Sequence, residues 1–121
     1  MSHTIREIGY FGNIFVRQID LSEPGDIHPG ERHYFDHMSL VTQGQIRCEW
    51  RDPDGTTGTE FYAANTPRSA INMPATRWHT LISITPATTW CLFAVRDAEG
   101  LVVLDRSEAN PVPTYKQGAG A

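Results

Sequence analysis

Short β-type segments separated by turn residues recur along the whole chain, and no stretch has the 3.6-residue apolar period of an amphipathic helix. The apolar residues Ile46, Cys48 and Trp50 alternate with charged ones, which is the pattern of a half-buried strand. Asp52-Pro53-Asp54-Gly55 then gives a strong turn signal, because proline fixes φ and glycine accepts a positive φ. Many short strands with Gly/Pro turns predict an all-β protein, built as an antiparallel sandwich or barrel.

The expected strands are short and bounded by turns; they cover residues 5–10, 14–19, 31–42, 46–50, 57–63, 69–73, 78–84, 89–96 and 101–104. Breaks are expected at residues 22–26 and at Pro29-Gly30. A chain of 121 residues has no room for a second independent core. Residues 1–109 are therefore expected to form one barrel, with the Pro/Gly/Ala-rich residues 110–121 as a tail outside it.

Charge and hydropathy exclude several classes of partner. The net charge is -4 and no Lys/Arg cluster stands out, so neither nucleic acid nor an anionic membrane is an expected partner. No apolar stretch approaches the roughly 18 residues of a transmembrane helix, and the N-terminus lacks the apolar core of a signal peptide. A cytoplasmic location follows. Cys48 and Cys91 are interpreted as small reduced core residues, with a disulfide or a thiolate ligand as the alternatives.

The chemical signal lies in four histidines: His28, His33, His37 and His79. If residues 31–42 form one extended strand, Glu31, His33 and His37 project from the same face. Neutral imidazole with carboxylate oxygen suits a divalent transition metal. A single inward histidine is more often a hydrogen-bonded core residue than a ligand, but burying three ionisable groups together is costly unless something pairs with them. Spacing alone leaves both interpretations open.

The same segment resembles the first motif of the cupin superfamily, which reads glycine, five residues, HxH, three or four residues, glutamate, six residues, glycine. When the motif is aligned on Gly44, its opening glycine falls on Gly25. The two histidine slots fall on Glu31 and His33, and the glutamate slot falls on His37. Histidine and glutamate have thus exchanged places relative to the family pattern.

The second cupin motif, PxG, two residues, histidine, three residues, asparagine, is matched in part. Pro74 and His79 agree with it, whereas Thr76 stands in the glycine slot and Ser83 in the asparagine slot. The resemblance covers about residues 25–97 and implies a cupin: a jelly-roll barrel, or antiparallel double-stranded β-helix.

The resemblance also implies one divalent transition metal ion per chain, held by Glu31, His33, His37 and His79. Iron is the first expectation, and copper, nickel, manganese and zinc are the alternatives. If Glu31 is not a ligand, it is expected to accept a hydrogen bond beside the metal or to act as a general base. His28 is the alternative ligand.

A three-histidine, one-glutamate site resembles those of cupin dioxygenases, so the expected function is oxidation of a small-molecule substrate. A metal-dependent lyase or isomerase and a non-catalytic small-molecule-binding cupin are the alternatives. Arg77 either binds an anionic substrate or is a surface or salt-bridged arginine. A homodimer is expected, with residues 5–19 as the contact. Four aromatic residues are interpreted as core or subunit contacts rather than a substrate cage: Trp50, Trp78, Trp90 and Phe93.

Overall fold

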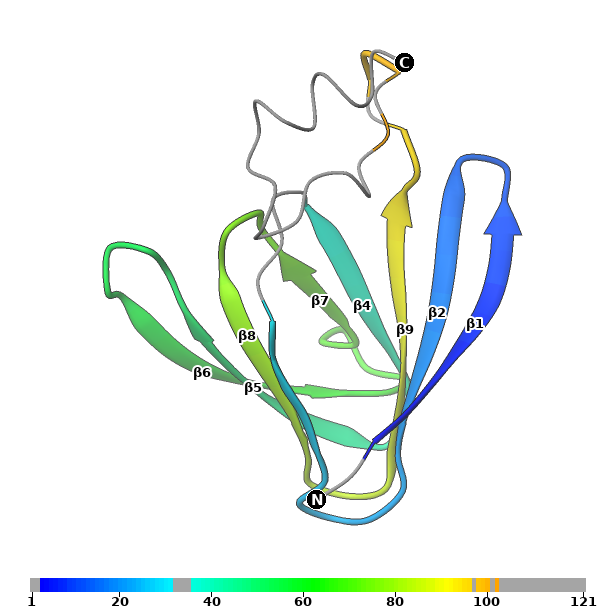
Figure 1. Ribbon diagram of the computed structural model, residues 1–121. Coiled ribbons are helices and arrows are strands. Elements are labelled where there is room, and N and C mark those ends of the chain that lie inside the picture. Colours follow the sequence, from blue (N-terminus) through cyan, green and yellow to red (C-terminus); the bar gives the residue numbers. More distant parts are fainter. Residues whose placement is uncertain (1–2, 32–35, 97, 101, 103–121) are drawn as a thin grey trace.

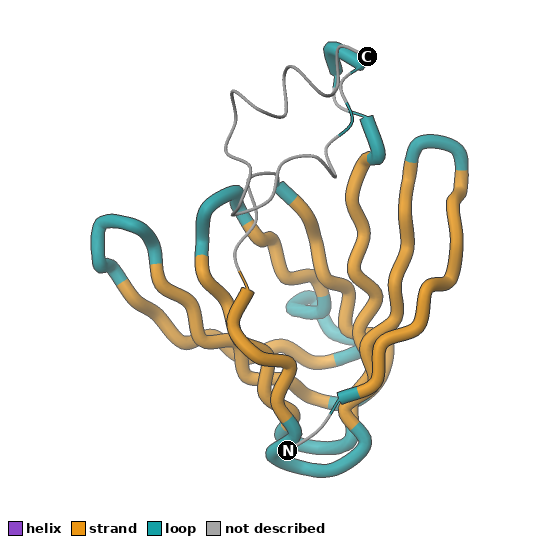
Figure 2. Tube along the Cα trace, viewed as in Figure 1, coloured by secondary structure: helices purple, strands orange, loops and turns teal. Residues whose placement is uncertain are grey.

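The computed structural model describes residues 3–31, 36–96, 98–100 and 102. Within these ranges every regular element is a β-strand, and the strands form two antiparallel sheets (Figures 1 and 2). The strands are β1 (Thr4–Phe11), β2 (Ile14–Leu21), β3 (Ile27–Glu31), β4 (His37–Gln43), β5 (Gln45–Arg51), β6 (Thr57–Ala63), β7 (Ala70–Met73), β8 (Trp78–Ser83) and β9 (Ala87–Ala94). The predicted all-β class is confirmed.

The chain passes repeatedly from one sheet to the other. The five-stranded sheet has the order β1-β2-β9-β4-β7, and the four-stranded sheet has the order β3-β8-β5-β6. Strands far apart in sequence are therefore hydrogen-bonded neighbours, as β2 is to β9 and β5 to β8. This winding, with antiparallel pairing throughout, is the predicted jelly-roll barrel. In Figure 1 the strands of the two sheets flare apart at one end of the barrel.

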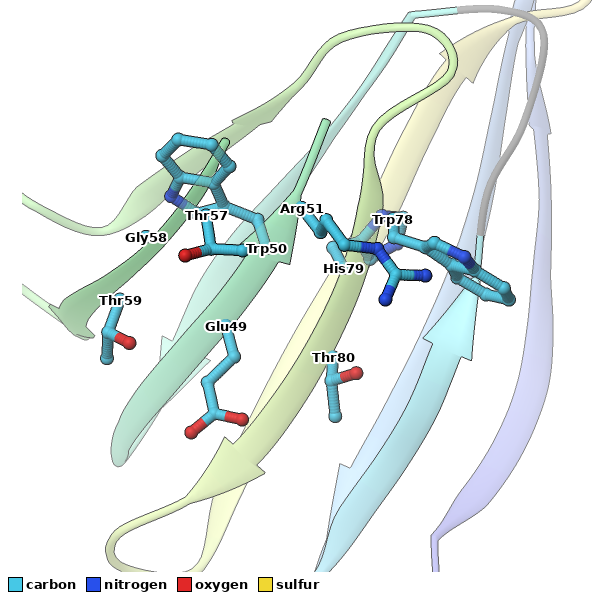
Figure 3. A pocket seen from close by; sticks show the side chains of 9 residues that line it. All are labelled: Glu49, Trp50, Arg51, Thr57, Gly58, Thr59, Trp78, His79 and Thr80. Atoms are coloured by element: carbon cyan, nitrogen blue, oxygen red, sulfur yellow. The ribbon is translucent and has the colours of Figure 1, made fainter. Parts of the chain in front are cut away.

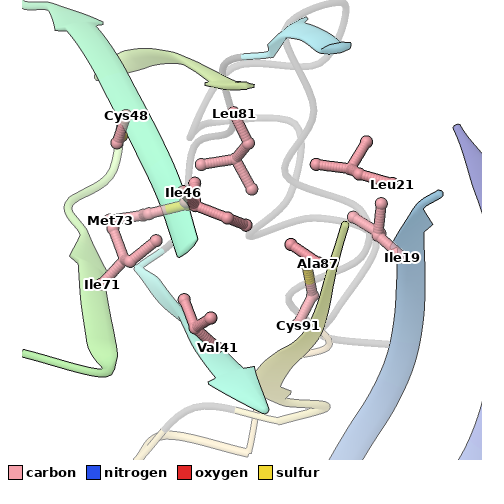
Figure 4. Close-up of a cluster of buried hydrophobic side chains, with 10 residues drawn as sticks. All are labelled: Ile19, Leu21, Val41, Ile46, Cys48, Ile71, Met73, Leu81, Ala87 and Cys91. Carbon is pink, nitrogen blue, oxygen red and sulfur yellow. The ribbon is translucent and has the colours of Figure 1, made fainter. Parts of the chain in front are cut away.

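The core lies between the two sheets because alternate side chains of each strand point inward. In β8, His79, Leu81 and Ser83 are buried while the residues between them are half-buried. Both sheets contribute to one cluster of buried side chains (Figure 4): Ile19, Leu21, Val41, Ile46, Cys48, Ile71, Met73, Leu81, Ala87 and Cys91. Burial of each large aliphatic side chain stabilises the fold by roughly 1.5–3 kcal/mol.

The two cysteines are buried core residues with free thiols, as predicted. They come from opposite sheets, Cys48 from β5 and Cys91 from β9. The Cys91 thiol lies 3.4 Å from the hydroxyl oxygen of Ser39 on the neighbouring strand. They do not form a disulfide with each other.

The glycine that anchors the first motif has a steric reason to be glycine. Gly44 joins β4 to β5 with φ +78°, a left-handed conformation. A Cβ atom at this position would lie 2.1 Å from the carbonyl oxygen of Pro86, which is backbone and cannot move aside. The tight passage between the two sheets at this point depends on the absence of a side chain.

The predicted break at Pro29-Gly30 is wrong, because both residues lie within β3. β3 is the edge strand of its sheet, where a proline without an N–H can face away from the neighbouring strand. The register with β8 shifts between His28 and Glu31, so the strand continues through an irregularity rather than ending.

The prediction of one strand over residues 31–42 is also wrong. Glu31 ends β3 in the four-stranded sheet, whereas His37 begins β4 in the five-stranded sheet. The segment looks continuous because both of its ends are strand-like, but the barrel uses it to cross between sheets. Glu31 and His37 therefore do not share a strand face.

The other predicted strands up to residue 96 agree with the structure to within two residues, and β6 has the predicted bounds. Of the predicted last strand, Val102 is described, and it forms an isolated bridge with Arg96. The other residues predicted for that strand lie outside the described residues. The boundary predicted between residues 1–109 and 110–121 also lies outside them. In the part of the chain that is described, no helix is long and apolar enough to cross a membrane.

Candidate metal centre

His79 occupies the middle of the four-stranded sheet and points into the barrel. It lies in β8 between Glu31 of β3 and Trp50 of β5, its two register partners. Only 4% of its surface is exposed. Its Nδ1 lies 3.3 Å from the carbonyl oxygen of Arg77. In the tautomer that donates from Nδ1 to this carbonyl, Nε2 carries the lone pair, which is how ligating histidines are commonly oriented.

His37 reaches the same place from the opposite sheet. It is the first residue of β4, it is half-buried, and it alternates with the inward residues Ser39 and Val41. Its ring centroid lies 5.3 Å from that of His79, with 56° between the ring planes. Two imidazoles that share an ion at a metal–nitrogen distance of about 2.1 Å have ring centroids roughly 4.5–5.5 Å apart. The pair therefore has the spacing of two ligands of one metal ion.

The other two predicted ligands are placed in part or not at all. Glu31 is the register partner of His79, so its backbone lies beside the histidine pair. Its side chain and the whole of His33 lie outside the described residues. Among the residues that are described, no group of three or more His, Cys, Asp or Glu side chains has the arrangement of a metal site. The structure thus brings together half of the predicted set.

His28, the alternative ligand, sits one register step deeper on β3, where its partner on β8 is Leu81. Its side chain is 4% exposed. The ring of His3 packs edge-on against it, with centroids 4.9 Å apart. His3 had no role in the sequence interpretation, because it lies close to the chain terminus, yet it covers this buried histidine.

The turn before β8 keeps the geometry of the cupin motif although its glycine is missing. The N–H of Arg77 donates to the carbonyl of Pro74 at 3.3 Å, which closes a four-residue turn. Its third residue, Thr76, has φ +69°, as a type II turn requires. A β-branched residue is strained in this conformation. The backbone at position 76 therefore has the positive φ that suits the motif's glycine, and the sequence differs from the motif only in carrying a side chain there.

Ser83, in the asparagine slot of the motif, has a structural role. Its hydroxyl donates to the carbonyl oxygen of Glu23 at 2.6 Å, and 2% of the residue is exposed. The bond ties the far end of β8 to the loop that precedes β3. The bond thereby helps to hold β3 and β8 in register, and these are the strands that carry the predicted ligands Glu31 and His79.

A pocket of about 290 Å³ lies beside His79, and one wall of it is a charged network that sequence reasoning missed. Glu60 accepts hydrogen bonds from Tyr62 Oη at 2.7 Å, Arg68 Nη2 at 3.0 Å and Trp50 Nε1 at 3.2 Å. The bond from Tyr62, followed by those from the other two donors, keeps the pKa of Glu60 below its usual value. The sequence signal for this network is the alternation of residues 58, 60 and 62, which places them on one face of the predicted strand.

Arg77 forms a salt bridge, which agrees with the second of the two roles predicted for this residue. Its Nε and Nη2 donate to the two oxygens of Asp52 at 2.8 and 3.0 Å. Its guanidinium also stacks 3.8 Å above the Trp50 ring. These bonds lower the pKa of Asp52. The pair fixes the loop after β5 against the turn that precedes β8.

The four aromatic residues do not form one cage. Trp50 lines the pocket beside His79, and Phe93 packs on Phe15 within the other sheet at 5.2 Å. Trp90 donates from Nε1 to Gln18 Oε1 at 3.1 Å. Trp78 borders a hollow of about 530 Å³ on the four-stranded sheet (Figure 3). The four residues therefore do not form one cage, but none of them belongs to the buried core cluster, and a role as subunit contacts stays a prediction.

Comparisons with known proteins place the fold. No protein-family model matches the sequence, and no curated protein matches it. The chain is similar to the solved structure of a cupin superfamily protein from Desulfitobacterium hafniense, with a TM-score of 0.62 and 11% identity over 77% of each chain. It is also similar to a protein of unknown function from Streptococcus pyogenes, with a TM-score of 0.61 and 15% identity over 80% of this chain and 77% of that one.

Two oxalate enzymes are also similar in structure. A Bacillus subtilis oxalate decarboxylase variant has a TM-score of 0.64 and 17% identity over 74% of this chain, which spans 24% of the enzyme. An oxalate oxidase has a TM-score of 0.57 and 11% identity over 74% of this chain, which spans 48% of that enzyme. Sequence identities this low carry the fold alone. The chain therefore has the cupin fold that its two partial motifs predicted.

Proposed function

We propose that this protein binds one divalent transition metal ion on Glu31, His33, His37 and His79 and uses it to act on a small molecule. The observation that carries the proposal is the approach of His37 and His79, whose ring centroids lie 5.3 Å apart although the residues belong to different sheets. Iron is the first candidate, and copper, nickel, manganese and zinc are the alternatives. The Mn(II) centres of the oxalate decarboxylase named above support a divalent ion in this fold.

The donor set suits such an ion, because imidazole nitrogen and carboxylate oxygen bind borderline divalent metals. A bound ion of this kind supplies Lewis acidity and, for iron or copper, redox capacity. The chain supplies the orientation: the carbonyl of Arg77 fixes the ring of His79 through Nδ1. Glu31 would serve as a fourth ligand or as the base that takes a proton from the substrate.

The reaction we propose first is dioxygenation of a small bidentate substrate, such as a diketone, an enediol or a thiol. The test is O₂ consumption by the iron-loaded protein with a panel of such compounds, with a His37→Ala variant as the control. O₂ uptake that depends on the substrate and is lost in His37→Ala would support dioxygenation. No uptake with any member of the panel would overturn it.

A lyase or isomerase is the second candidate, favoured by the structural similarity to oxalate decarboxylase. It uses the same residues without oxygen. Product formation under strictly anaerobic conditions separates it from the dioxygenase. A metal-loaded protein that binds small molecules without turnover, with and without O₂, would instead be a non-catalytic binding cupin.

We also propose that the protein is a homodimer joined through its N-terminal hairpin. β1 is an edge strand, and its exposed apolar residues include Ile5, which is 42% exposed, and Phe11, which is 62% exposed. Pairing with a second copy would cover this edge. Light scattering should give twice the chain mass for the wild type and the monomer mass for an Ile5→Lys/Phe11→Lys variant. A monomeric wild type at high concentration would contradict the proposal.

A further inference from the structure

Arg17 points into the barrel. It lies in β2, and the residues that flank it at alternate positions, Phe15, Ile19 and Leu21, are all buried. Ile19 and Leu21 belong to the core (Figure 4). The register partner of Arg17 on β9 is Cys91, which is 5% exposed. An arginine therefore occupies the layer directly above the apolar core.

Among the described side chains, none is a counter-charge for Arg17. Its Nε is buried and makes no hydrogen bond in the part of the chain that the structure describes, nor is an ion pair of Arg17 found there. The other half-buried arginines pair with carboxylates: Arg77 lies 2.8 Å from Asp52, and Arg47 lies 3.2 Å from Glu49. A half-buried cation without a partner is costly, so its environment suits an anion that arrives from outside the chain.

The position of Arg17 places that anion near the histidine pair. Arg17, Cys91 and Ser39 are consecutive register partners across β2, β9 and β4, and His37 lies two residues from Ser39. Strand spacing and rise put the Cα atoms of Arg17 and His37 roughly 12 Å apart. An arginine side chain covers about half of that distance, so a small molecule held by the guanidinium would extend toward the imidazoles.

Aromatic side chains lie near Arg17 on its own sheet. Phe15 and Phe93 pack at 5.2 Å between ring centroids, and Tyr10 lies 5.1 Å from Phe15. Phe15 is two residues from Arg17 on the same strand face. Apolar walls lower the local dielectric and strengthen a guanidinium–carboxylate pair relative to one in water. One cation among aromatic rings is the composition of a site for a small organic acid.

We propose that Arg17 is a substrate-binding residue that holds a carboxylate, so that the ligand of this barrel is a small organic acid anion. The further step, in which the acid also reaches the metal, rests on the function proposed above. Binding of the carboxylate by Arg17 does not depend on that function. The guanidinium fork matches a carboxylate in two parallel hydrogen bonds. Phe15 and Phe93 contact the body of the acid.

The test is binding of benzoate to protein that has been freed of metal and dialysed free of chelator, measured by calorimetry and by thermal unfolding. Benzamide, which lacks the charge, is the control ligand. Arg17→Gln is the main variant, and Arg51→Gln, at an exposed position of β5, is the matched control. Arg17→Lys keeps the charge but loses the fork.

We expect benzoate, but not benzamide, to raise the unfolding temperature of the wild type and of Arg51→Gln. Arg17→Gln should bind benzoate about 10- to 100-fold more weakly, and Arg17→Lys should fall between the two. Without benzoate, Arg17→Gln should be as stable as the wild type, because it removes an unpaired charge. If it proves unfolded, the comparison rests on Arg17→Lys, and equal affinity of that variant and the wild type would overturn the proposal.

Equal benzoate affinity in Arg17→Gln and the wild type would also overturn it. The same holds if neither benzoate nor oxalate binds the wild type, metal-free or metal-loaded. Metal content is measured in parallel and should be the same in Arg17→Gln and the wild type. Arg17-dependent binding in a protein that takes up no metal would uphold this proposal and reject the metal-dependent function, so the two failures are distinguishable.

Discussion

His37 and His79 come from facing sheets of the barrel, and their ring centroids lie 5.3 Å apart. Neither neighbourhood in sequence nor a shared strand brings them together, since 41 residues separate them in the chain. The jelly-roll winding does so, because it places the start of β4 opposite the start of β8. Because the two histidines belong to different sheets, the packing of the core between those sheets determines the distance between their rings.

Replacement of Thr76 by glycine should stabilise the fold. Thr76 has φ +69°, and glycine adopts this conformation without strain. Relief of the strain, less the extra chain entropy of glycine in the unfolded state, should raise the free energy of unfolding by roughly 0.5–1 kcal/mol. Urea denaturation measures it. Thr59→Gly, in the exposed part of β6, should lower the same free energy. Equal effects of the two substitutions would contradict the account.

Replacement of Gly44 by alanine should be strongly destabilising. The new Cβ would lie 2.1 Å from the carbonyl oxygen of Pro86, in addition to the cost of a positive φ. We expect a loss of about 3 kcal/mol or more. Gly55→Ala is the matched control, because Gly55 has φ +92° but a Cβ added there would have nothing within 4 Å. It should lose about 1 kcal/mol, and similar losses at both sites would refute the close approach.

The Asp52–Arg77 pair predicts a pH dependence of stability. Hydrogen bonding to Arg77 lowers the pKa of Asp52 below its ordinary value of 3.8. The pair therefore stabilises the fold above that ordinary value, and this contribution is lost as pH falls through the lower folded pKa. Asp52→Asn should be less stable than the wild type at pH 7, and the difference should shrink towards pH 2. A difference that stays constant in denaturant titrations over this range would contradict it.

Cys48 should be unreactive although it borders the pocket beside His79. Burial, followed by the nearby Glu60 carboxylate, raises the pKa of its thiol to about 11. At pH 8 about one molecule in a thousand would carry the thiolate. The folded protein should therefore react slowly with a disulfide reagent, and the unfolded chain should release two thiols. Rapid modification of one thiol in the folded state would show that Cys48 is not buried as described.

The fold could be predicted because its determinants are local. The alternation in β5, the turn at residues 52–55 and the glycine at position 44 each specify a strand or a reversal by their own chemistry. Of the motif residues, Gly44 forms the turn between β4 and β5, and His79 is buried in β8. Thr76 shows that a motif can persist in the backbone when its characteristic residue is absent.

The site was less predictable because it is made across sheets. The sequence placed Glu31 and His37 on one strand, since nothing local marks the crossing between β3 and β4. Pro29 and Gly30 looked like a break because an edge strand and a turn tolerate the same residues. Arg17 was overlooked, although its alternation with Ile19 in a strand already placed it on the inward face.

The metal content of the protein tests the central proposal most directly. Wild type, His37→Ala/His79→Ala and the control His28→Gln are to be purified without chelator and analysed for transition metals, before and after reconstitution under reducing, anaerobic conditions. We predict close to one ion per chain in the wild type and in His28→Gln, and its loss in the double variant. A wild type that takes up no metal, or a double variant that keeps it, would contradict the proposed centre.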